Sequence, residues 1–191
     1  MDDENLWIVS DELPFGSLRH FLDTSSPKGI STKLVQYIAK QLLEAIAYLH
    51  SNSSIHKYLV SNESDIRASN LFIDHSGDVK LGGFHNSVCK IQNGRRLKAV
   101  FKCVGFAEWM APEILSQNRA YNEKSDIYSF GITLLELLKG RSPFYKWPSI
   151  KIMYRKLSND LDDFIPQTVN LHCNKLSKII SQCLRKDPNE R

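Results

Sequence analysis

Residues 65–70, with the sequence DIRASN, bring three side chains with useful chemistry close together. Asp65 supplies a carboxylate, Arg67 a guanidinium and Asn70 a carboxamide. A carboxylate can accept a proton from a hydroxyl group, a guanidinium can bind a phosphate group, and a carboxamide oxygen can ligate a hard cation. A plainer interpretation stays open, in which Asp65 is a solvated loop acid that caps a turn.

The elements that must position these residues are mostly helical. Apolar residues at helical spacing predict a helix from Ser31 to near His50, with an inward face made of Leu34, Ile38, Leu42, Ile46 and Leu49. Apolar residues on all sides of 124–139 predict a central, buried helix that Gly140 and Pro143 end. Shorter helices are predicted at 17–23, 109–115, 149–157 and 175–184, and strands at 6–10, 71–73 and 79–81. Residues 82–106 lack a period and are expected to form a long loop. The expected fold class is α+β, mostly α.

Length and composition exclude several classes of protein. The chain has 191 residues, 42% of them hydrophobic, and a net charge of +4, which is ordinary for one globular domain and predicts no nucleic-acid partner. The longest apolar stretch is short and contains Glu136 and Lys139, so no membrane span is predicted. The four cysteines include no CxxC pair, so we expect reduced thiols and no metal site.

Five segments, taken in order, resemble the protein kinase family, specifically its large C-terminal lobe. They are LWIVSDELPFGSL, IRASNLFI, WMAPEIL, KSDIYSFGITLLELLKGRSPF and LRKDPNER. The resemblance implies a partial kinase-like domain over residues 1–191. It would run from the hinge strand, with a minimal remnant of the small-lobe sheet, to the penultimate helix, without the small lobe or the last helix. The chain resembles sterile-20-type kinases and the sterile-20-related adaptor pseudokinases, the latter through GRRLKAVFKCVGFAEWMAPEIL, YNEKSDIYSFGIT and WPSIKIMYRKLSN.

In this family, a carboxylate, a basic residue two positions later and an asparagine three positions after that serve phosphoryl transfer. Asp65, Arg67 and Asn70 match that spacing, but the preceding His-Arg-Asp run is broken. His56 matches its first residue, and Tyr58–Ser64 then intervenes. Either Asp65 is the base after an insertion, or Tyr58 replaces the base. Both alternatives disturb a loop whose geometry matters to within about an ångström.

Two further family positions have lost their chemistry. Gly83 stands where the family has the aspartate that ligates magnesium, followed by Phe84 as an apolar packing residue. Phe106 stands where active relatives have a threonine whose hydroxyl ties the substrate platform to the catalytic residues. Because neutral Asn70 is a poor ligand on its own, no magnesium site is expected.

By contrast, the residues that hold the family's fold together are kept. Glu113 is expected to pair with Arg191, and Asp126 to accept backbone N–H groups of the catalytic loop. Trp109 and Pro112 are expected to be packing anchors. Resemblance also places Ser10, Asp11, Leu13 and Phe72 at the nucleotide pocket. ATP binding stays open only for a full-length parent that encloses the nucleotide.

Because family positions that carry catalytic chemistry are lost while those that pack the fold are kept, the sequence predicts a pseudokinase. The resemblance implies an adaptor that activates a partner serine/threonine kinase allosterically, together with a helical scaffold protein and without a membrane partner. Two alternatives stay open: an active serine/threonine kinase with a disturbed catalytic loop, and an inert fragment. The expected location is the cytoplasm, with the nucleus as a second compartment.

Overall fold

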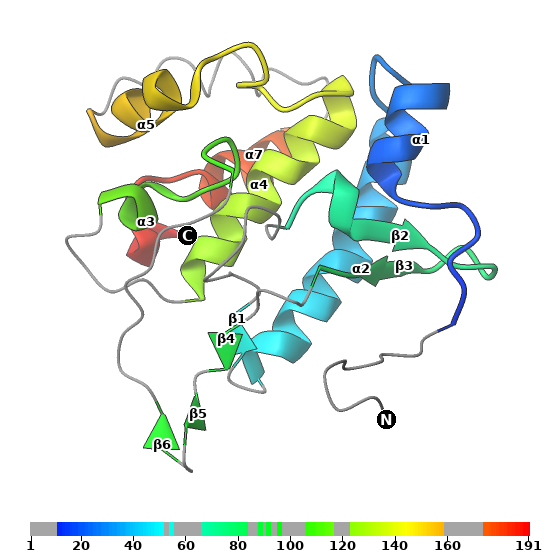
Figure 1. Ribbon diagram of the computed structural model, residues 1–191, viewed down its shortest axis with the longest axis horizontal. Coiled ribbons are helices and arrows are strands. Elements are labelled where there is room, and N and C mark those ends of the chain that lie inside the picture. Colours follow the sequence, from blue (N-terminus) through cyan, green and yellow to red (C-terminus); the bar gives the residue numbers. More distant parts are fainter. Residues whose placement is uncertain are drawn as a thin grey trace, which may run out of the picture.

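The computed structural model describes residues 11–51, 54–55, 66–83, 88–89, 91–92, 95–96, 106–116, 123–158 and 174–191. The helices are α1 (Leu18–Ser25), α2 (Thr32–Ser51), α3 (Pro112–Ser116), α4 (Lys124–Lys139), α5 (Ser149–Leu157) and α7 (Asn174–Cys183) (Figure 1). Short 3-10 turns cover Ala68–Asn70 and Pro188–Glu190. The described part is mostly helical with short antiparallel strands, as predicted. None of its helices is long and apolar enough to cross a membrane.

Helix α4 is the centre of the fold. Its bounds are those predicted, and Phe130, Ile132, Leu134 and Leu137 are completely buried. Gly140 ends the helix in the left-handed conformation with φ 78°. Its Cα hydrogen faces Pro27, since a Cβ there would lie 2.1 Å from the Pro27 carbonyl oxygen. Gly29 (φ 95°) approaches α4 as closely, because its Cβ would lie 2.1 Å from the Leu138 oxygen.

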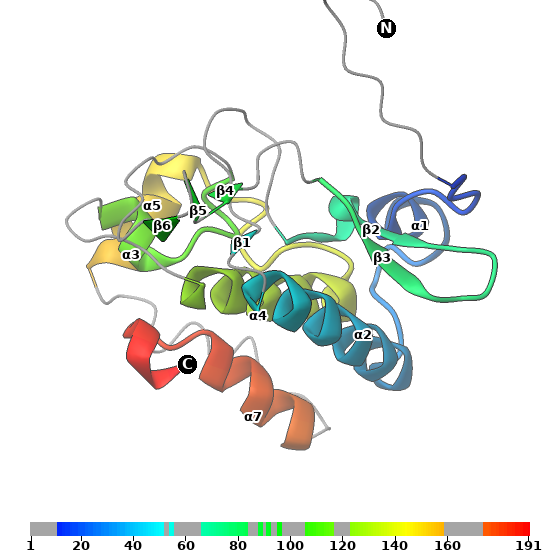
Figure 2. The same ribbon diagram turned by 90° about the horizontal axis from the view of Figure 1, so that it is seen from below.

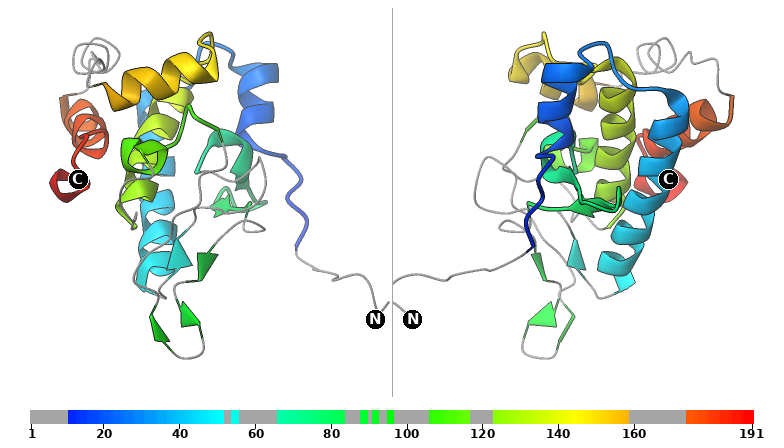
Figure 3. Two further views of the ribbon diagram at one scale, coloured as in Figure 1. Left: turned by 60° about the vertical axis from the view of Figure 1, so that its left-hand side comes forward. Right: turned by 90° about the vertical axis from the view of Figure 1, so that its right-hand side faces the viewer.

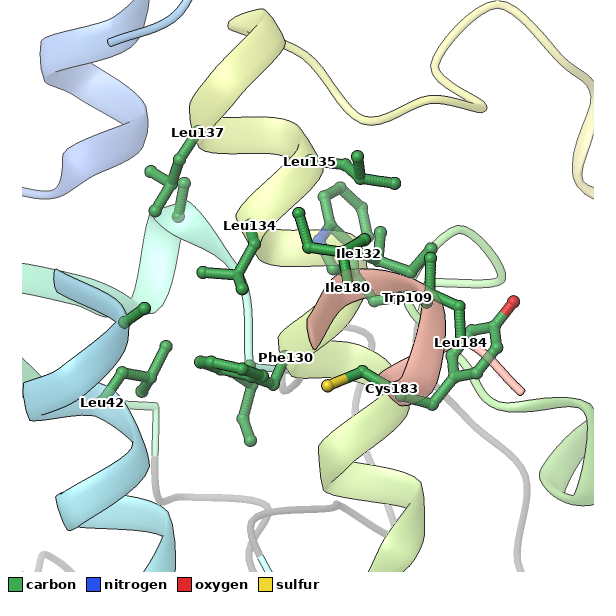
Figure 4. Packing of buried hydrophobic residues seen from close by; sticks show 14 of the residues in the cluster. Leu42, Trp109, Phe130, Ile132, Leu134, Leu135, Leu137, Ile180, Cys183 and Leu184 are labelled. Carbon is green, nitrogen blue, oxygen red and sulfur yellow. The ribbon is translucent and has the colours of Figure 1, made fainter. Parts of the chain in front are cut away.

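Helices α2 and α7 pack on α4 (Figures 2 and 4). Helix α7 lies on the side of α4 away from the β-hairpin, and Ile180, Cys183 and Leu184 face Phe130 and its neighbours. Helix α2 buries Ile38, Leu42 and Ile46 as predicted. The prediction for Leu34 was wrong, because Leu34 is 39% exposed while Val35 is buried in its place. The inward stripe therefore begins one residue later than the spacing indicated.

Strands β2 (Leu71–Ile73) and β3 (Val79–Leu81) form the predicted antiparallel hairpin, with Leu71 opposite Leu81. Asp74 organises its turn, because its carboxylate accepts hydrogen bonds from the backbone N–H groups of Ser76 and Asp78. These bonds and the Ser76 hydroxyl hold the pKa of Asp74 well below its ordinary value. The hairpin brings Asn70 and Gly82 together, since the Gly82 N–H donates to the Asn70 carbonyl at 2.8 Å.

Two predictions of local structure, one for residues 82–106 and one for the start of α3, need correction. Residues 82–106 were expected to lack regular structure, yet they contain the two-residue strands β4 (Val88–Cys89), β5 (Ile91–Gln92) and β6 (Arg95–Arg96). Strand β4 pairs with β1 (Ser54–Ile55), and β5 pairs with β6. Such short pairs carry no hydrophobic period that a sequence could reveal. Helix α3 begins at Pro112 rather than Trp109, since proline favours the first turn of a helix. The predicted strand 6–10 lies outside the described residues.

Candidate functional site

A row of buried polar side chains runs along α4 and holds the site together. Its members are Asp126, Ser129, Thr133 and Glu136, all less than 5% exposed. Steps of three, four and three residues place them on one face of the helix. We call this row the α4 polar stripe. Sequence analysis identified Asp126 and missed the other three, although polar residues at helical spacing in an apolar helix were a usable signal.

The C-terminal half of the α4 polar stripe fixes the backbone of residues 66–70. The Thr133 hydroxyl donates to the Ile66 carbonyl, and the Ala68 N–H donates to Glu136 Oε2 at 3.1 Å. Arg19 of α1 donates to Glu136 Oε1, also at 3.1 Å. Burial raises the pKa of Glu136, against the Ala68 and Arg19 contacts that favour its charged form. The chain thus holds Arg67 and Asn70 in a fixed backbone frame.

The N-terminal half of the stripe reaches α2 and the segment after Phe106. Asp126 Oδ2 lies 2.9 Å from His50 Nε2, and the Ser129 hydroxyl donates to the Trp109 carbonyl at 2.9 Å. Residues 56–65 of the catalytic loop lie outside the described residues, so the expected bonds from the backbone of this loop to Asp126 stay a prediction. Asp65, His56 and Phe84 lie outside them as well. The spatial relation of the candidate base to Arg67 therefore stays a prediction.

Arg67 and Phe106 meet directly. The guanidinium carbon of Arg67 lies 3.9 Å from the centroid of the Phe106 ring and 5.8 Å from that of Trp109. Phe106 and Trp109 are perpendicular, with centroids 6.1 Å apart. A cation over an aromatic face is an attractive arrangement. The loss of the threonine hydroxyl at position 106 stays a prediction, and the contact between Phe106 and Arg67 was not predicted from the sequence.

Gly83 and Asn70 share one small space. Gly83 has φ 77°, and a Cβ built on it would lie 2.7 Å from the Cγ and Nδ2 atoms of Asn70. Asn70 is itself only 8% exposed. The side chain of Asn70 thus occupies the place from which a carboxylate at position 83 would project.

This arrangement does not fit a magnesium ion. A magnesium site at a nucleotide uses carboxylates and phosphate oxygens, whereas Asn70 and Gly83 offer here a buried, neutral carboxamide beside a glycine. Within the described ranges, no group of three or more His, Cys, Asp or Glu side chains could hold a metal ion. We therefore derive no catalytic step through a metal at these residues.

A buried lysine fixes the segment Ala107–Met110, which we call the platform. Lys156 of α5 is 1% exposed, and its ammonium group donates to the carbonyl oxygens of Ala107 (2.8 Å), Glu108 (2.7 Å) and Met110 (2.7 Å). Three acceptors satisfy the three donors of an ammonium group. Sequence analysis missed Lys156, although its spacing of four from buried Ile152 placed it on the inner face of α5.

The expected pair between Glu113 and Arg191 is formed in bidentate geometry. Arg191 Nη1 lies 2.6 Å from Glu113 Oε1, and Nη2 lies 2.9 Å from Oε2. The Arg191 side chain is fully buried and also donates to the Arg185 and Lys186 carbonyls. The pair joins α3, directly after the platform, to the end of the described chain. Trp109 and Pro112 are both buried, in keeping with a packing role.

The expected nucleotide residues are only partly described. Asp11 is exposed, Leu13 and Phe72 are half-buried, and Ser10 lies outside the described residues. An isolated β-bridge joins Ser17 to Phe72, which brings the start of α1 next to β2. Phe72 also closes over Gly82, whose missing Cβ would lie 2.9 Å from the Phe72 ring.

A family model described as the protein kinase domain matches residues 1–191. The chain belongs to the protein kinase family. The family predicted from the five sequence segments is therefore confirmed. The described helices correspond to the large-lobe arrangement that the resemblance implied.

Similar proteins in this family carry two kinds of name. Serine/threonine-protein kinase fray2 of Dictyostelium discoideum is 34% identical over 188 residues, which are 98% of this chain and 17% of that protein. Serine/threonine-protein kinase fray1 of the same organism is 33% identical over 192 residues, or 100% and 32% of the two chains. STE20-related kinase adapter protein alpha of Gallus gallus is 32% identical over 171 residues, which are 87% of this chain and 42% of that protein. The chain thus spans less than half the length of each of these kinase-family relatives.

Proposed function

We propose that this kinase-family chain is a pseudokinase adaptor that binds a partner kinase and does not transfer phosphate. The observation that carries the proposal is the Gly83–Asn70 contact. A carboxylate cannot project from residue 83 without displacing Asn70. Removing one such electrostatic group costs about 100- to 1,000-fold in rate.

The ordered platform supports binding as the retained activity. Three hydrogen bonds from Lys156 and one from Ser129 hold the backbone of the platform in place. The bidentate pair between Glu113 and Arg191 anchors the residues that follow. A surface whose backbone is fixed loses little conformational entropy when a partner binds. We infer that the partner is a kinase catalytic domain, because some relatives are named kinase adapters.

An active serine/threonine kinase is the second candidate. It is favoured by the names of fray1 and fray2, to which the chain is about one third identical. The preserved spacing of Asp65, Arg67 and Asn70 also fits it. The two candidates differ in whether Asp65 acts as a base.

A phosphotransfer assay on the intact protein separates the two candidates. Incubation with ATP and either Mg²⁺ or Mn²⁺ and a generic serine/threonine substrate is expected to give no product above that of an Asp65→Ala variant. Phosphotransfer that Asp65→Ala abolishes would establish the kinase and overturn the adaptor. A second arm measures the activity of a co-expressed partner kinase. Activation by the wild type, reduced by Lys156→Met and kept by Lys178→Met at an exposed site on α7, is the expected result for an adaptor.

A further inference from the structure

A groove opens beside the C-terminal end of α4, where the connection between α1 and α2 passes that helix (Figure 3). It has a volume of about 580 Å³ and is open to solvent. Its walls come from residues 27–28 of the connection, 138–139 of α4 and the turn 141–145 that follows. A backbone hydrogen bond of 2.8 Å from the Ile30 N–H to the Leu137 carbonyl ties the connection to the helix. The groove is therefore preformed, and we call it the α4-end groove.

Three basic side chains line the α4-end groove, namely Lys28, Lys139 and Arg141. Lys28 and Lys139 are exposed, and neither makes a hydrogen bond or an ion pair with another residue in the described part of the chain. Partial burial lowers the pKa of Lys139, the direction expected for an ammonium group that loses water without gaining a counter-ion. An anion in the groove would supply that counter-ion.

Arg141 has an acidic neighbour in Asp23 of α1, whose Oδ1 lies 2.8 Å from Arg141 Nη1. Asp23 is shared, because Arg19 Nε and Nη2 lie 3.0 Å and 2.9 Å from its two carboxylate oxygens. Arg19 in turn pairs with Glu136 at 3.1 Å. Two arginines and two carboxylates thus form one chain of alternating charge, which is balanced when both carboxylates are ionised. The contact with Asp23 uses Nη1 of Arg141 and leaves its Nε and Nη2 groups to donate to another acceptor.

The charge that remains at the α4-end groove is positive. Beside the balanced chain, Lys28 and Lys139 add two positive charges that no described residue pairs with. A phosphomonoester carries a charge of about −1.5 to −2 at pH 7 and three acceptor oxygens, so it matches both this excess and the three basic side chains. A carboxylate has a single charge and two oxygens. The groove therefore favours a phosphate group over an acidic side chain.

The other walls of the groove are largely apolar. Pro27, Pro143 and Tyr145 line it, and Tyr145 is 53% exposed. A free phosphate ion would leave these surfaces in water, whereas the residues on either side of a phosphorylated side chain can pack on them. An open groove of this kind suits a segment of polypeptide.

We propose that the α4-end groove binds a phosphorylated serine or threonine in an extended segment of a partner protein. The phosphate would accept hydrogen bonds from Arg141 and lie between the ammonium groups of Lys28 and Lys139. The partner would then be held only in its phosphorylated state. The groove shares no residue with the platform or with residues 66–83, so the proposal goes beyond the proposed function and does not depend on it.

The test measures the binding of the intact protein to three fluorescein-labelled peptides by fluorescence anisotropy. The peptides consist of glycine and alanine with a leucine on each side of one central residue, which is phosphoserine, glutamate or serine. The phosphoserine peptide is expected to have a dissociation constant about tenfold or more below that of the other two, because charge-assisted hydrogen bonds to phosphate are strong.

Two pairs of lysines separate the groove from general electrostatic attraction. Lys28→Ala with Lys139→Ala is expected to weaken binding of the phosphoserine peptide about tenfold or more. The matched control is Lys175→Ala with Lys178→Ala on α7, which removes the same charge outside the groove and should leave binding unchanged. All four lysines are exposed, so both double variants should keep the melting temperature of the wild type.

Several results would overturn the proposal. Equal binding of the phosphoserine and glutamate peptides, no binding of any peptide, or equal losses from the two lysine pairs would each do so. Inorganic phosphate that competes as well, mole for mole, as an unlabelled phosphoserine peptide would identify a free anion as the ligand. Binding to vesicles of phosphatidylserine and phosphatidylcholine, with none to the peptides, would identify a membrane surface instead. No platform residue is changed in this test, so its failure leaves the proposed function standing.

Discussion

The guanidinium of Arg67 stacks on the ring of Phe106, with 3.9 Å between the guanidinium carbon and the ring centroid. The contact links the 3-10 turn after Ile66 to the start of the platform. We predict a favourable coupling free energy of about 0.5–2 kcal/mol between the two side chains. A double-mutant cycle with Arg67→Met and Phe106→Leu, followed by urea unfolding, measures it.

The exposed pair of Arg141 and Tyr145 is the control for that cycle. The Arg141 guanidinium carbon lies 5.9 Å from the Tyr145 ring centroid. A double-mutant cycle on this pair should give a smaller coupling free energy. Equal coupling in the two cycles would mean that the Arg67–Phe106 contact adds nothing specific.

An aspartate introduced at position 83 is not expected to restore magnesium binding. Gly83→Asp must displace Asn70 and place a side chain at φ 77°, a backbone strain of about 1–3 kcal/mol before any clash is counted. We predict a lower melting temperature and no stabilisation of the variant by ATP with Mg²⁺ in thermal-shift measurements.

Gly77→Ala is the control, because it introduces the backbone strain of a positive φ without a steric clash. Gly77 has φ 87°, and nothing lies within 4 Å of its missing Cβ. Gly83→Ala should therefore destabilise the chain more than Gly77→Ala. A Gly83→Asp variant that bound magnesium and transferred phosphate would contradict both this prediction and the adaptor proposal.

Arg191→Ala is expected to destabilise the chain by about 3–5 kcal/mol, because it leaves Glu113 as a poorly compensated buried charge. The Glu113 and Arg191 side chains are 10% and 0% exposed. The comparison is Glu190→Gln, which breaks the pair between Arg185 and Glu190, whose side chains are 56% and 55% exposed. That change should cost about 0–1 kcal/mol. Similar losses from the two variants in urea unfolding would refute the role given to Arg191.

Lys156→Met should loosen the platform. The substitution removes the donor from three carbonyl groups, and a buried polar group without a partner costs about 1–3 kcal/mol. Faster hydrogen exchange in the segment around residues 107–110 is the specific sign. Lys151→Met, on the exposed side of the same helix, should change neither exchange nor stability. Unchanged exchange in Lys156→Met would show that other contacts hold the platform.

The buried Cys183 thiol is expected to make the free energy of unfolding depend on pH. Burial raises its pKa from 9.0 to about 11. The folded chain therefore keeps a proton that the unfolded chain releases, so this contribution to stability is complete below pH 9.0 and is lost as the pH rises toward 11. The difference in unfolding free energy between the wild type and Cys183→Ala should shrink across that window. A constant difference would rule out this contribution.

The sequence predicted elements with a strong hydrophobic period and missed contacts made by polar groups. Helices α4 and α5 have the predicted bounds because apolar residues at helical spacing define their inner faces, while Gly140 ends α4 and Pro148 precedes α5. The contacts of Lys156 and of Phe106 were not predicted, because their partners are distant in the sequence. A lysine looks exposed until its three carbonyl acceptors are known, and a phenylalanine shows no partner in the sequence until Arg67 is placed beside it.

The strands between 88 and 96 show another limit. Each has two residues, which is too short for an alternating pattern to appear. The family was nevertheless evident, because whole segments such as WMAPEIL carry backbone turns and packing residues together. Local chemistry could then be judged position by position, as at Gly83.

The reciprocal approach of Gly29 to Leu138 and of Gly140 to Pro27 makes one interlocked joint between the α1–α2 connection and the end of α4. Each glycine leaves room for the other segment's backbone, so neither position tolerates a methyl group while the other stays in place. A single alanine at either position would therefore push the α1–α2 connection and the end of α4 apart, and a second alanine could not compensate for the first.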